Sequence, residues 1–392
     1  MKKILLVFGT RPEAIKMCPL VLELKKHDAF DVCVCLTGQH REMLRQVMDA
    51  FSVQEDYNLD IMQKAQTLTQ VTCGVISGME DILARAKPDV VLVHGDTTTS
   101  YAAALAAFYR KIPVGHVEAG LRSGNIYSPF PEEMNRLMTD RISVYHFAPT
   151  EGNRENLLRE GVSETGIFVT GNTVIDALAT TVREDYVFAN DVLAAETFGT
   201  CTMPRSADDG AAAGTHTSSA ASAGTIRYIA LTAHRRENLG EPMRAIFRAV
   251  RRIADAYDDV RIIYPVHMNP AVREPADEIL GGHDRILLTD PIDVLDMHNL
   301  LARCHLVLTD SGGLQEEAPA FGKPVLVLRT ETERPEAVEA GTVKVVGVEE
   351  EAVFAATKEL LDDARAYLAM AHAVNPYGDG HASGRIAQAL IL

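Results

Sequence analysis

Short runs of apolar, β-branched residues alternate with helix-length segments along almost the whole chain. The runs of the first half are KILLVFG, FDVCVCLTG, PDVVLVHGD, IPVGHVEAG, YHFAPT and GIFVTGN, and those of the second half are RYIALTA, RIIYPVH, RILLTD, LVLTDSGG and PVLVLRT. Most of them are apolar at consecutive positions, which is typical of parallel strands that helices cover on both faces. The sequence therefore predicts an α/β protein with two doubly wound domains.

The gap between the two series of runs indicates where the domains divide. We expect the first domain over residues 1–175, with its boundary near TGNTVIDAL. The 392 residues, 47% of them hydrophobic, are enough for two cores. Residues 197–225 are rich in Ala, Gly, Ser and Thr and cannot form a core of their own. We interpret this segment as a flexible surface insertion in the second domain.

Charge and targeting signals narrow the class of partner. The formal net charge is −16, from 54 acids against 38 bases, which argues against a nucleic-acid surface or docking on an anionic membrane. The apolar run in MKKILLVFGT is too short for a signal peptide, and no stretch approaches the roughly 20 apolar residues of a membrane span. The six cysteines lack CxxC and Cys/His metal spacings, and Cys33 and Cys35 alternate as buried free thiols would. We expect a cytoplasmic protein without a metal site.

Cations follow the first strand of each predicted domain. FGTRPEAIK reads as a strand, a turn at Gly9 and a helix with a proline near its start, so Arg11 and Lys16 fall in the opening turns. Free backbone N–H groups and the helix dipole there favour an anion. A plain turn with solvent-facing cations fits this stretch equally well. In the second domain, His234, Arg235 and Arg236 follow a strand in the same way, which favours a phosphate-facing role.

TDSGGLQEEA carries the most specific signal for a phosphate. Ser311 is expected to cap a helix, while Gly312 and Gly313 let backbone amides approach a phosphate closely. Glu316 or Glu317 would then accept from ribose hydroxyls. The spacing is neither the GxGxxG fingerprint nor a P-loop, so the stretch indicates a phosphate or sugar-nucleotide site without NAD or ATP chemistry. Further on, Arg334 precedes a helix-starting proline and is either a second cation for the same diphosphate or a solvated loop residue.

Carboxylates gather after strands of the first domain. Each has a structural interpretation: Asp96 before three threonines reads as a helix N-cap, and Glu132 forms an i,i+4 pair with Arg136 at a helix start. Glu118 and Glu133 complete the group. Because ligands of α/β proteins bind at the carboxyl ends of strands, the set together points to a reaction site.

The motifs taken together are similar to one family. FGTRPEAIK, TGQHREML, HGDTTTS, HVEAGLRSG, SPFPEEMNR, TGNTVIDAL, HRRENLG, YPVHMNP, TDSGGLQEEAP and ERPEAVEAGT occur in this order. They closely resemble the non-hydrolysing, bacterial UDP-N-acetylglucosamine 2-epimerases, from about residue 3 to about residue 386 without the insertion. The resemblance implies two Rossmann-like domains facing across a cleft, the GT-B architecture. It also implies a second domain over residues 176–372, a C-terminal helix over 373–392 that crosses back to the first domain, and a homodimer.

The resemblance further implies an activity and its residues. The reaction is the reversible conversion of UDP-GlcNAc to UDP-ManNAc, by elimination of UDP to 2-acetamidoglucal and re-addition. It needs no cofactor and supplies ManNAc-type sugars for cell-surface polysaccharides. The residues that match the family's catalytic positions are Asp96, Glu118, Glu132 and His234. Those that match substrate-binding positions are Arg11, Lys16, Met297, Ser311, Gly312, Gly313, Glu317 and Arg334. Met297 replaces an aromatic residue often found near the uracil.

Family members also bind a second UDP-GlcNAc as an activator. The matching positions are Gln39, Gln66, Arg235 and His267. Ala65 stands where an arginine is expected, which argues against that regulation here.

Three rival functions share parts of this pattern. Hydrolysing epimerases release ManNAc and UDP, but the animal type carries a kinase domain for which this chain leaves no residues. A GT-B glycosyltransferase needs an acceptor, often a lipid, and the acidic chain has no basic amphipathic helix. A sugar-nucleotide sensor would have lost the catalytic acids, yet Asp96, Glu118 and Glu132 are all present.

Overall fold

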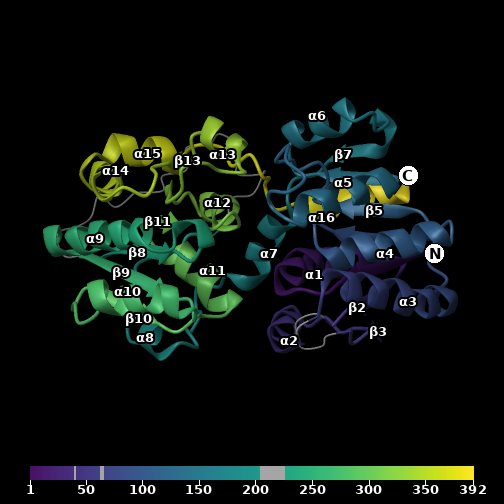
Figure 1. Cartoon of the computed structure of the whole chain (residues 1–392), viewed down its shortest axis with the longest axis horizontal. Helices are drawn as coiled ribbons and strands as arrows, with labels where there is room; N and C mark the ends of the chain where they lie inside the picture. The colour runs from purple at the N-terminus through teal and green to yellow at the C-terminus, as the bar shows by residue number, and fades with distance from the viewer. Residues whose placement is uncertain (39–40, 62–65, 204–225) are drawn as a thin grey trace. The chain divides into compact units, whose positions relative to one another are not determined.

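The computed structural model describes residues 1–38, 41–61, 66–203 and 226–392, without the side chains of residues 41–43. These residues divide into two compact units (Figure 1). Unit 1 comprises Met1–Thr180 and Tyr377–Leu392, and unit 2 comprises Thr181–Pro376.

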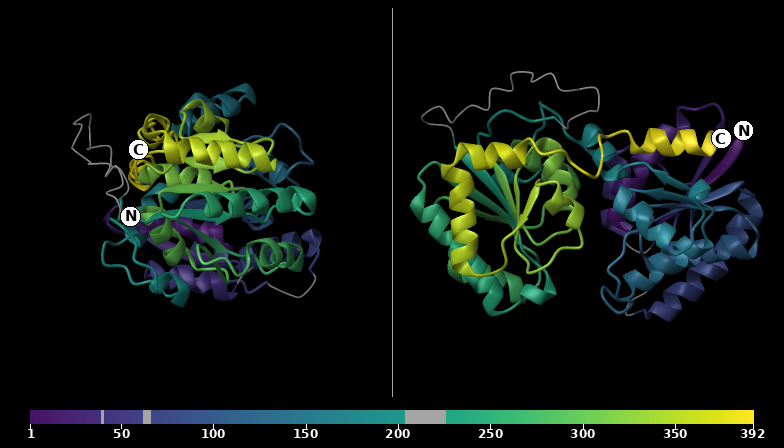
Figure 2. Two further views of the ribbon diagram at one scale, coloured as in Figure 1. Left: turned by 90° about the vertical axis from the view of Figure 1, so that its left-hand side faces the viewer. Right: turned by 90° about the horizontal axis from the view of Figure 1, so that it is seen from above.

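Unit 1 is built on a seven-stranded parallel sheet with the order β3-β2-β1-β4-β5-β6-β7. Its strands are β1 (Lys2–Phe8), β2 (Phe30–Leu36), β3 (Tyr57–Asn58), β4 (Val90–His94), β5 (Val114–Val117), β6 (Tyr145–Ala148) and β7 (Ile167–Val169). Its helices are α1 (Arg11–Lys25), α2 (Arg41–Ala50), α3 (Leu68–Ala86), α4 (Thr98–Tyr109), α5 (Glu132–Ile142), α6 (Glu151–Arg159), η1 (Glu164–Gly166), α7 (Thr173–Thr181, its last residue in unit 2) and α16 (Ala382–Ile391). The helices α1 and α16 pack together on one face of the sheet, and α3 and α4 pack together on the other (Figure 2).

The C-terminal helix α16 belongs to unit 1 through polar contacts at both of its ends. The Asp176 carboxylate accepts from the backbone N–H groups of Ala382 and Ser383 at 3.1 and 2.7 Å. Burial raises the pKa of Asp176, although these hydrogen bonds oppose the shift. At the other end, Lys2 Nζ donates to the Leu390 carbonyl at 2.6 Å. The last helix of the chain is thereby joined to its first strand.

Unit 2 contains a six-stranded parallel sheet with the order β10-β9-β8-β11-β12-β13. Its strands are β8 (Arg227–Thr232), β9 (Val260–Pro265), β10 (Ile286–Thr289), β11 (Leu306–Thr309), β12 (Val325–Val327) and β13 (Val343–Val345). Its helices are α8 (Asp191–Ala194), η2 (Arg236–Asn238), α9 (Glu241–Ala256), α10 (Pro270–Leu280), α11 (Val294–Arg303), α12 (Leu314–Glu317), η3 (Ala318–Phe321), α13 (Pro335–Glu339), α14 (Glu350–Asp362) and α15 (Ala364–Ala371). One core cluster joins α9, α10 and α14 to alternate residues of the central strands, among them Ile229 and Leu231.

Most of the segment interpreted as a flexible insertion, residues 204–225, lies outside the described residues. Its first part, residues 197–203, contacts unit 2. The Phe198 ring lies 4.9 Å from the Phe188 ring and 4.5 Å from the Tyr228 ring, centroid to centroid. Lys323 Nζ donates to Thr202 Oγ1 at 3.0 Å. The large apolar side chain of Phe198 gives this part an aromatic anchor that the Ala/Gly/Ser composition does not suggest.

The predicted doubly wound α/β architecture is confirmed. Each run quoted above forms a parallel strand, and two further edge strands, β3 and β13, were not predicted.

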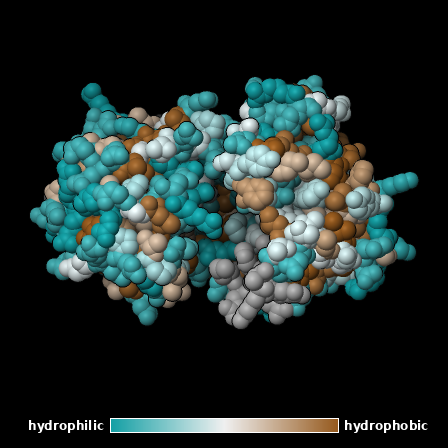
Figure 3. Space-filling view, viewed as in Figure 1, coloured by the Kyte–Doolittle hydropathy of each residue, from teal (hydrophilic) through white to brown (hydrophobic). Residues whose placement is uncertain are grey.

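Several large apolar side chains of unit 1 are exposed, including Phe108, Tyr109 and Phe130. Figure 3 shows apolar patches on the side of this unit turned toward the viewer. Among the described residues, no helix is long and apolar enough to cross a membrane.

Candidate functional site

Each sheet reverses its strand order once, between β1 and β4 in unit 1 and between β8 and β11 in unit 2. At such a point the loops leave two neighbouring strands in opposite directions and open a crevice at the carboxyl edge of the sheet. The cations after β1 and the acid after β4 therefore share one edge in unit 1. The cations after β8 and the TDSGG turn after β11 share the corresponding edge in unit 2.

Asp96 follows β4 and forms an ion pair with Arg136 of α5. The amide of Asn135 donates to the Asp96 carbonyl oxygen at 2.9 Å. The prediction that Asp96 caps the next helix is wrong, because Thr97 is the N-cap of α4 and accepts from Ser100 N–H at 3.1 Å. The Asp96 side chain is free of the capping role and a third of it is exposed (32%).

Glu118 is the residue directly after β5, and its backbone is strained. Its φ is +69°, in a region that non-glycine residues seldom occupy and that recurs at functional sites. Its carboxylate forms an ion pair with Lys16 of α1 and accepts from Asn172 Nδ2 at 2.8 Å. His94 Nε2 lies 3.6 Å from the same oxygen. The structure thus brings together a predicted catalytic acid and a predicted binding cation.

The adjacent glutamates at the start of α5 differ in their surroundings. Glu133 is buried and accepts from Ser123 N–H at 3.0 Å and from Arg136 Nη1 at 2.8 Å. Glu132 is half-buried, and no hydrogen bond or ion pair joins it to another described residue. The predicted pair between Glu132 and Arg136 is therefore wrong, because the Arg136 guanidinium lies between Glu133 and Asp96.

Glu13 is a site residue that the sequence reasoning missed. Its buried carboxylate accepts from the N–H groups of Gly9 and Thr10 at 2.9 and 2.7 Å, which closes a capping box at the start of α1. Its other oxygen accepts from the hydroxyls of Thr97 and Ser100, both at 2.7 Å. Glu13 therefore links the turn after β1 to the loop after β4. Arg11 is the first residue of α1 and is half-buried.

A second buried network supports the strand ends. The carboxylate of Asp140 lies 2.5 Å from His116 Nδ1 and 2.7 Å from Arg122 Nη2. The other ring nitrogen of His116 lies 2.7 Å from the Gly95 carbonyl. Burial raises the pKa of Asp140, but His116 and Arg122 lower it by more, to about 2. The network joins α5 to the residues just before Asp96.

This ionised carboxylate makes the stability of unit 1 pH-dependent. The folded-state pKa of Asp140 is below the ordinary value of 3.8, so its contribution is present above pH 4 and is lost as the pH falls toward 2. We expect Asp140→Asn to lower the free energy of unfolding at pH 7 by about 2 kcal/mol. That loss should shrink between pH 4 and pH 2 in urea unfolding followed by circular dichroism. The exposed Glu151→Gln is the control, and a loss independent of pH would contradict the assignment.

In unit 2, Asp310 follows β11 and is fully buried. Its Oδ2 accepts from the backbone N–H groups of His234 and Arg235, both at 2.8 Å, and from Asn238 Nδ2 at 3.2 Å. The His234 ring stacks on the His267 ring with 5.7 Å between centroids and 10° between planes. Partial burial, Arg235 and His267 lower the pKa of His234, while Asp310 opposes the shift.

Cations converge on the TDSGG turn. A Cβ placed on Gly312 would lie 3.7 Å from Arg235 Nη2 and 3.8 Å from both Arg334 Nη2 and Glu333 Oε2. Burial raises the pKa of Glu333, but Arg329, Arg235 and Arg334 lower it by more, so this carboxylate is ionised. Three guanidinium groups gather around Glu333, beside two glycines that carry no side chain. Two of these groups also pair with further carboxylates, Arg334 with Glu316 and Arg329 with Glu237. This arrangement suits a diphosphate.

The remaining predicted residues of unit 2 lie on this turn and on α11. The prediction that Ser311 caps a helix is wrong: α12 begins at Leu314 and has no side-chain cap, and Ser311 N–H donates to Thr309 Oγ1 at 2.9 Å. Glu317 Oε2 lies 3.5 Å from His298 Nε2, and a Cβ on Gly313 would meet Glu317 Oε1 at 3.2 Å. Arg334 is the N-cap residue of α13 and pairs with the buried Glu316. Met297 is half-buried on α11.

Three of the four residues assigned to an activator site are described. Arg235 and His267 lie beside His234 in unit 2. Gln66, in unit 1, donates to the Ile61 carbonyl at 2.6 Å. Gln39 and Ala65 lie outside the described residues.

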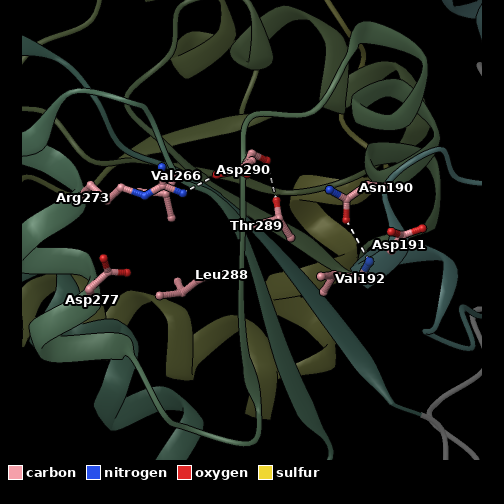
Figure 4. A pocket seen from close by; sticks show the side chains of 9 residues that line it. All are labelled: Asn190, Asp191, Val192, Val266, Arg273, Asp277, Leu288, Thr289 and Asp290. Carbon is pink, nitrogen blue, oxygen red and sulfur yellow. Dashed lines mark hydrogen bonds and ion pairs between the residues drawn. The ribbon is translucent and has the colours of Figure 1, made fainter.

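A hollow of about 390 Å³ lies elsewhere in unit 2, between α8, α10 and the ends of β9 and β10 (Figure 4). Three carboxylates line it, those of Asp191, Asp277 and Asp290, and its one cation, Arg273, pairs with Asp290. None of the predicted site residues lines it. Its negative charge makes it a poor site for a diphosphate.

Fold and strand-end chemistry place the chain among two-domain Rossmann-like enzymes. The family model described as UDP-N-acetylglucosamine 2-epimerase matches residues 22–391. The UDP-N-acetylglucosamine 2-epimerase of Bacillus subtilis (strain 168) is 52% identical over 390 residues, covering 100% of this chain and 95% of the relative. The chain therefore belongs to the UDP-N-acetylglucosamine 2-epimerase family, and the resemblance read from the sequence is confirmed.

Solved structures agree with this assignment. The Neisseria meningitidis UDP-GlcNAc 2-epimerase bound to UDP-GlcNAc is 45% identical, with a TM-score of 0.83 and 99% of each chain covered. The Methanocaldococcus jannaschii enzyme in complex with UDP-GlcNAc and UDP is 34% identical, with a TM-score of 0.76 and the same coverage.

Proposed function

We propose that this chain catalyses the non-hydrolysing, reversible epimerisation of UDP-GlcNAc to UDP-ManNAc, which supplies ManNAc-type sugars for cell-surface polysaccharides. The observation that carries the proposal is the set of carboxylates at the strand ends of unit 1, in a chain that matches the epimerase family over its length. The substrate is taken from the relatives whose structures hold UDP-GlcNAc.

The chemistry of the substrate explains why acids and cations are both needed. The C2 proton of UDP-GlcNAc is not next to a carbonyl, so a base alone hardly removes it. When the C1–O bond breaks, the electron pair leaves with UDP, positive charge builds at C1 and the C2 proton becomes acidic. Loss of that proton to a base gives 2-acetamidoglucal, and the reverse steps with protonation on the opposite face invert C2.

Residue roles in the proposal are those that the resemblance to the family implies. Asp96, Glu118 and Glu132 supply the carboxylates that exchange the C2 proton or stabilise charge at C1. Arg11, Lys16, Arg334 and the turn at Ser311, Gly312 and Gly313 hold the diphosphate, while His234 assists its departure. Glu317 and Met297 bind the nucleoside. The acting form in this proposal is a homodimer, which light scattering coupled to gel filtration measures directly.

Proton NMR of the purified protein with UDP-GlcNAc in D2O, without NAD or added metal, tests the proposal. We expect UDP-ManNAc with deuterium at C2, and deuterium in the recovered UDP-GlcNAc. Free ManNAc and UDP would show the hydrolysing reaction instead. No turnover, even with excess substrate as an activator, would refute epimerisation.

A second label tests elimination separately from simple proton exchange. The test uses UDP-GlcNAc with ¹⁸O at the bridging position between C1 and the β-phosphorus. During turnover the ¹⁸O should move from the bridging to the non-bridging positions of the β-phosphate, because freed UDP can return through another β-phosphate oxygen. Deuterium exchange with the bridge label unmoved would mean that C2 is deprotonated without cleavage of C1–O.

A further inference from the structure

The two carboxylate oxygens of Asp310 have different surroundings. Oδ2 accepts three N–H donors, from His234, Arg235 and Asn238. Oδ1 is buried and has no hydrogen-bond partner within the described part of the chain. The polar atom that faces it is His234 Nδ1, at 3.4 Å.

The position of Oδ1 constrains where His234 carries its proton. A neutral imidazole has one N–H group, on Nδ1 or on Nε2. With the proton on Nδ1, the orphaned oxygen faces a donor, whereas with the proton on Nε2 two lone pairs face each other in a buried space. Leaving a buried acceptor unpaired costs about 1–3 kcal/mol, and more for a charged group. The Nδ1–H tautomer is therefore the lower in energy.

We propose that Asp310 is a positioning residue for His234: it keeps Nδ1 protonated and so presents Nε2 as the nitrogen that meets the substrate. That Nε2 meets the substrate rests on the proposed function. A proton taken up from solvent at Nε2 gives an imidazolium whose charge Asp310 stabilises. Nε2–H passes that proton to the oxygen of the departing diphosphate, and when UDP returns to C1 the proton goes back to Nε2.

The groups facing His234 set its protonation in opposite directions. Arg235 and His267 lower its pKa together with partial burial, and Asp310 raises it. Without Asp310, burial, Arg235 and His267 would all act to keep the ring neutral. The side chain is 40% exposed, so it can reach a ligand.

Asp310→Asn tests the proposal because it changes one atom of the contact. The amide oxygen is expected to take the place of Oδ2, where three donors require an acceptor, which turns the NH2 group toward His234 Nδ1. That group needs an acceptor, so the tautomer should switch to Nε2–H. Long-range ¹H–¹⁵N spectra of protein with ¹⁵N-labelled histidine at pH 8 report the tautomer of each ring, and His234→Gln identifies the signal among 13 histidines.

We expect Nδ1–H in the wild type, Nε2–H in Asp310→Asn, and a fall in kcat of about 10²- to 10⁴-fold with a smaller change in KM. Asn238→Ser is the matched control, because it removes another partner of Asp310 but leaves Oδ1 in place. Its tautomer should stay Nδ1–H. An Nε2–H wild type, an unchanged tautomer in Asp310→Asn or a switch in Asn238→Ser would each overturn the proposal. The tautomer is readable even if the wild type fails as an epimerase, so the two failures are distinct.

Discussion

Glu132→Gln is expected to lower kcat for epimerisation by about 10²- to 10⁴-fold, the range that a positioned proton-transfer group contributes. Glu132 stands at the first position of α5, half-buried and without a partner among the residues the structure describes. Glutamine keeps its shape but cannot take up a proton as a carboxylate does. The thermal midpoint of unfolding should change little, because no hydrogen bond or ion pair among the described residues depends on the charge of Glu132.

Glu133→Gln is the matched comparison, one residue away. Its carboxylate is buried and holds both the backbone at Ser123 and the guanidinium of Arg136. We expect a loss of about 3 kcal/mol in the free energy of unfolding, because one partner of a buried ion pair is removed. Activity should also fall, since Arg136 positions Asp96. The distinguishing result is an inactive but stable Glu132→Gln beside a destabilised Glu133→Gln.

Steady-state kinetics and thermal unfolding of the two variants separate the roles. A Glu132→Gln enzyme with wild-type kcat would remove Glu132 from the reaction. Equal destabilisation by both substitutions would show that the Glu132 carboxylate has a structural partner.

The architecture was predictable because two independent signals indicate it: the strands are runs of consecutive apolar residues, and helix-length segments separate them. The edge strands β3 and β13 escaped prediction because they are short and, unlike the 3-residue strands β7 and β12, contain polar residues in place of an unbroken apolar run. Their pairing with β2 and β12 depends on neighbours that a short window of sequence does not contain. Tertiary contacts decide such strands.

The sequence predicted which residues belong to the site where these residues directly follow a strand. It did not predict which side chains they contact when the contacting residue comes from another element. The interpretation of Asp96 as a cap and of Glu132 as the partner of Arg136 used local spacing alone. The guanidinium of Arg136 instead bridges Glu133 of its own helix and Asp96 of the loop after β4. Glu13 was overlooked for a related reason, although the T-x-x-E spacing of Thr10 and Glu13 is the sequence signature of a capping box. That signature indicates the hydrogen bond from Thr10 N–H to the Glu13 carboxylate, but not those from Gly9, Thr97 and Ser100.

Asp310 was not predicted as a site residue, because the interpretation of TDSGG rested on its serine and its two glycines. An acid directly after a buried strand, in a loop that must also hold the first residues after β8, is a candidate for fixing those residues. Its contacts come from residues about 75 positions away in the chain. Only the parallel pairing of β8 with β11 makes the two loops neighbours.

Glu13→Ala is expected to lower the free energy of unfolding by about 2–5 kcal/mol, because it leaves the buried N–H groups of Gly9 and Thr10 without an acceptor. The hydroxyls of Thr97 and Ser100 have other partners and add less. Activity should fall with stability, since the turn carrying Arg11 is no longer joined to the loop carrying Asp96.

Glu13→Gln should restore much of both losses. Its amide oxygen can accept from the two backbone N–H groups, while its NH2 group donates to hydroxyls that rotate to accept. Urea unfolding gives the free energy of unfolding of both variants, and steady-state kinetics give their kcat/KM. Glu23→Ala on the same helix is the control for helix propensity. If glutamine and alanine cost the same, the negative charge of Glu13 rather than its hydrogen-bond geometry holds the two loops together.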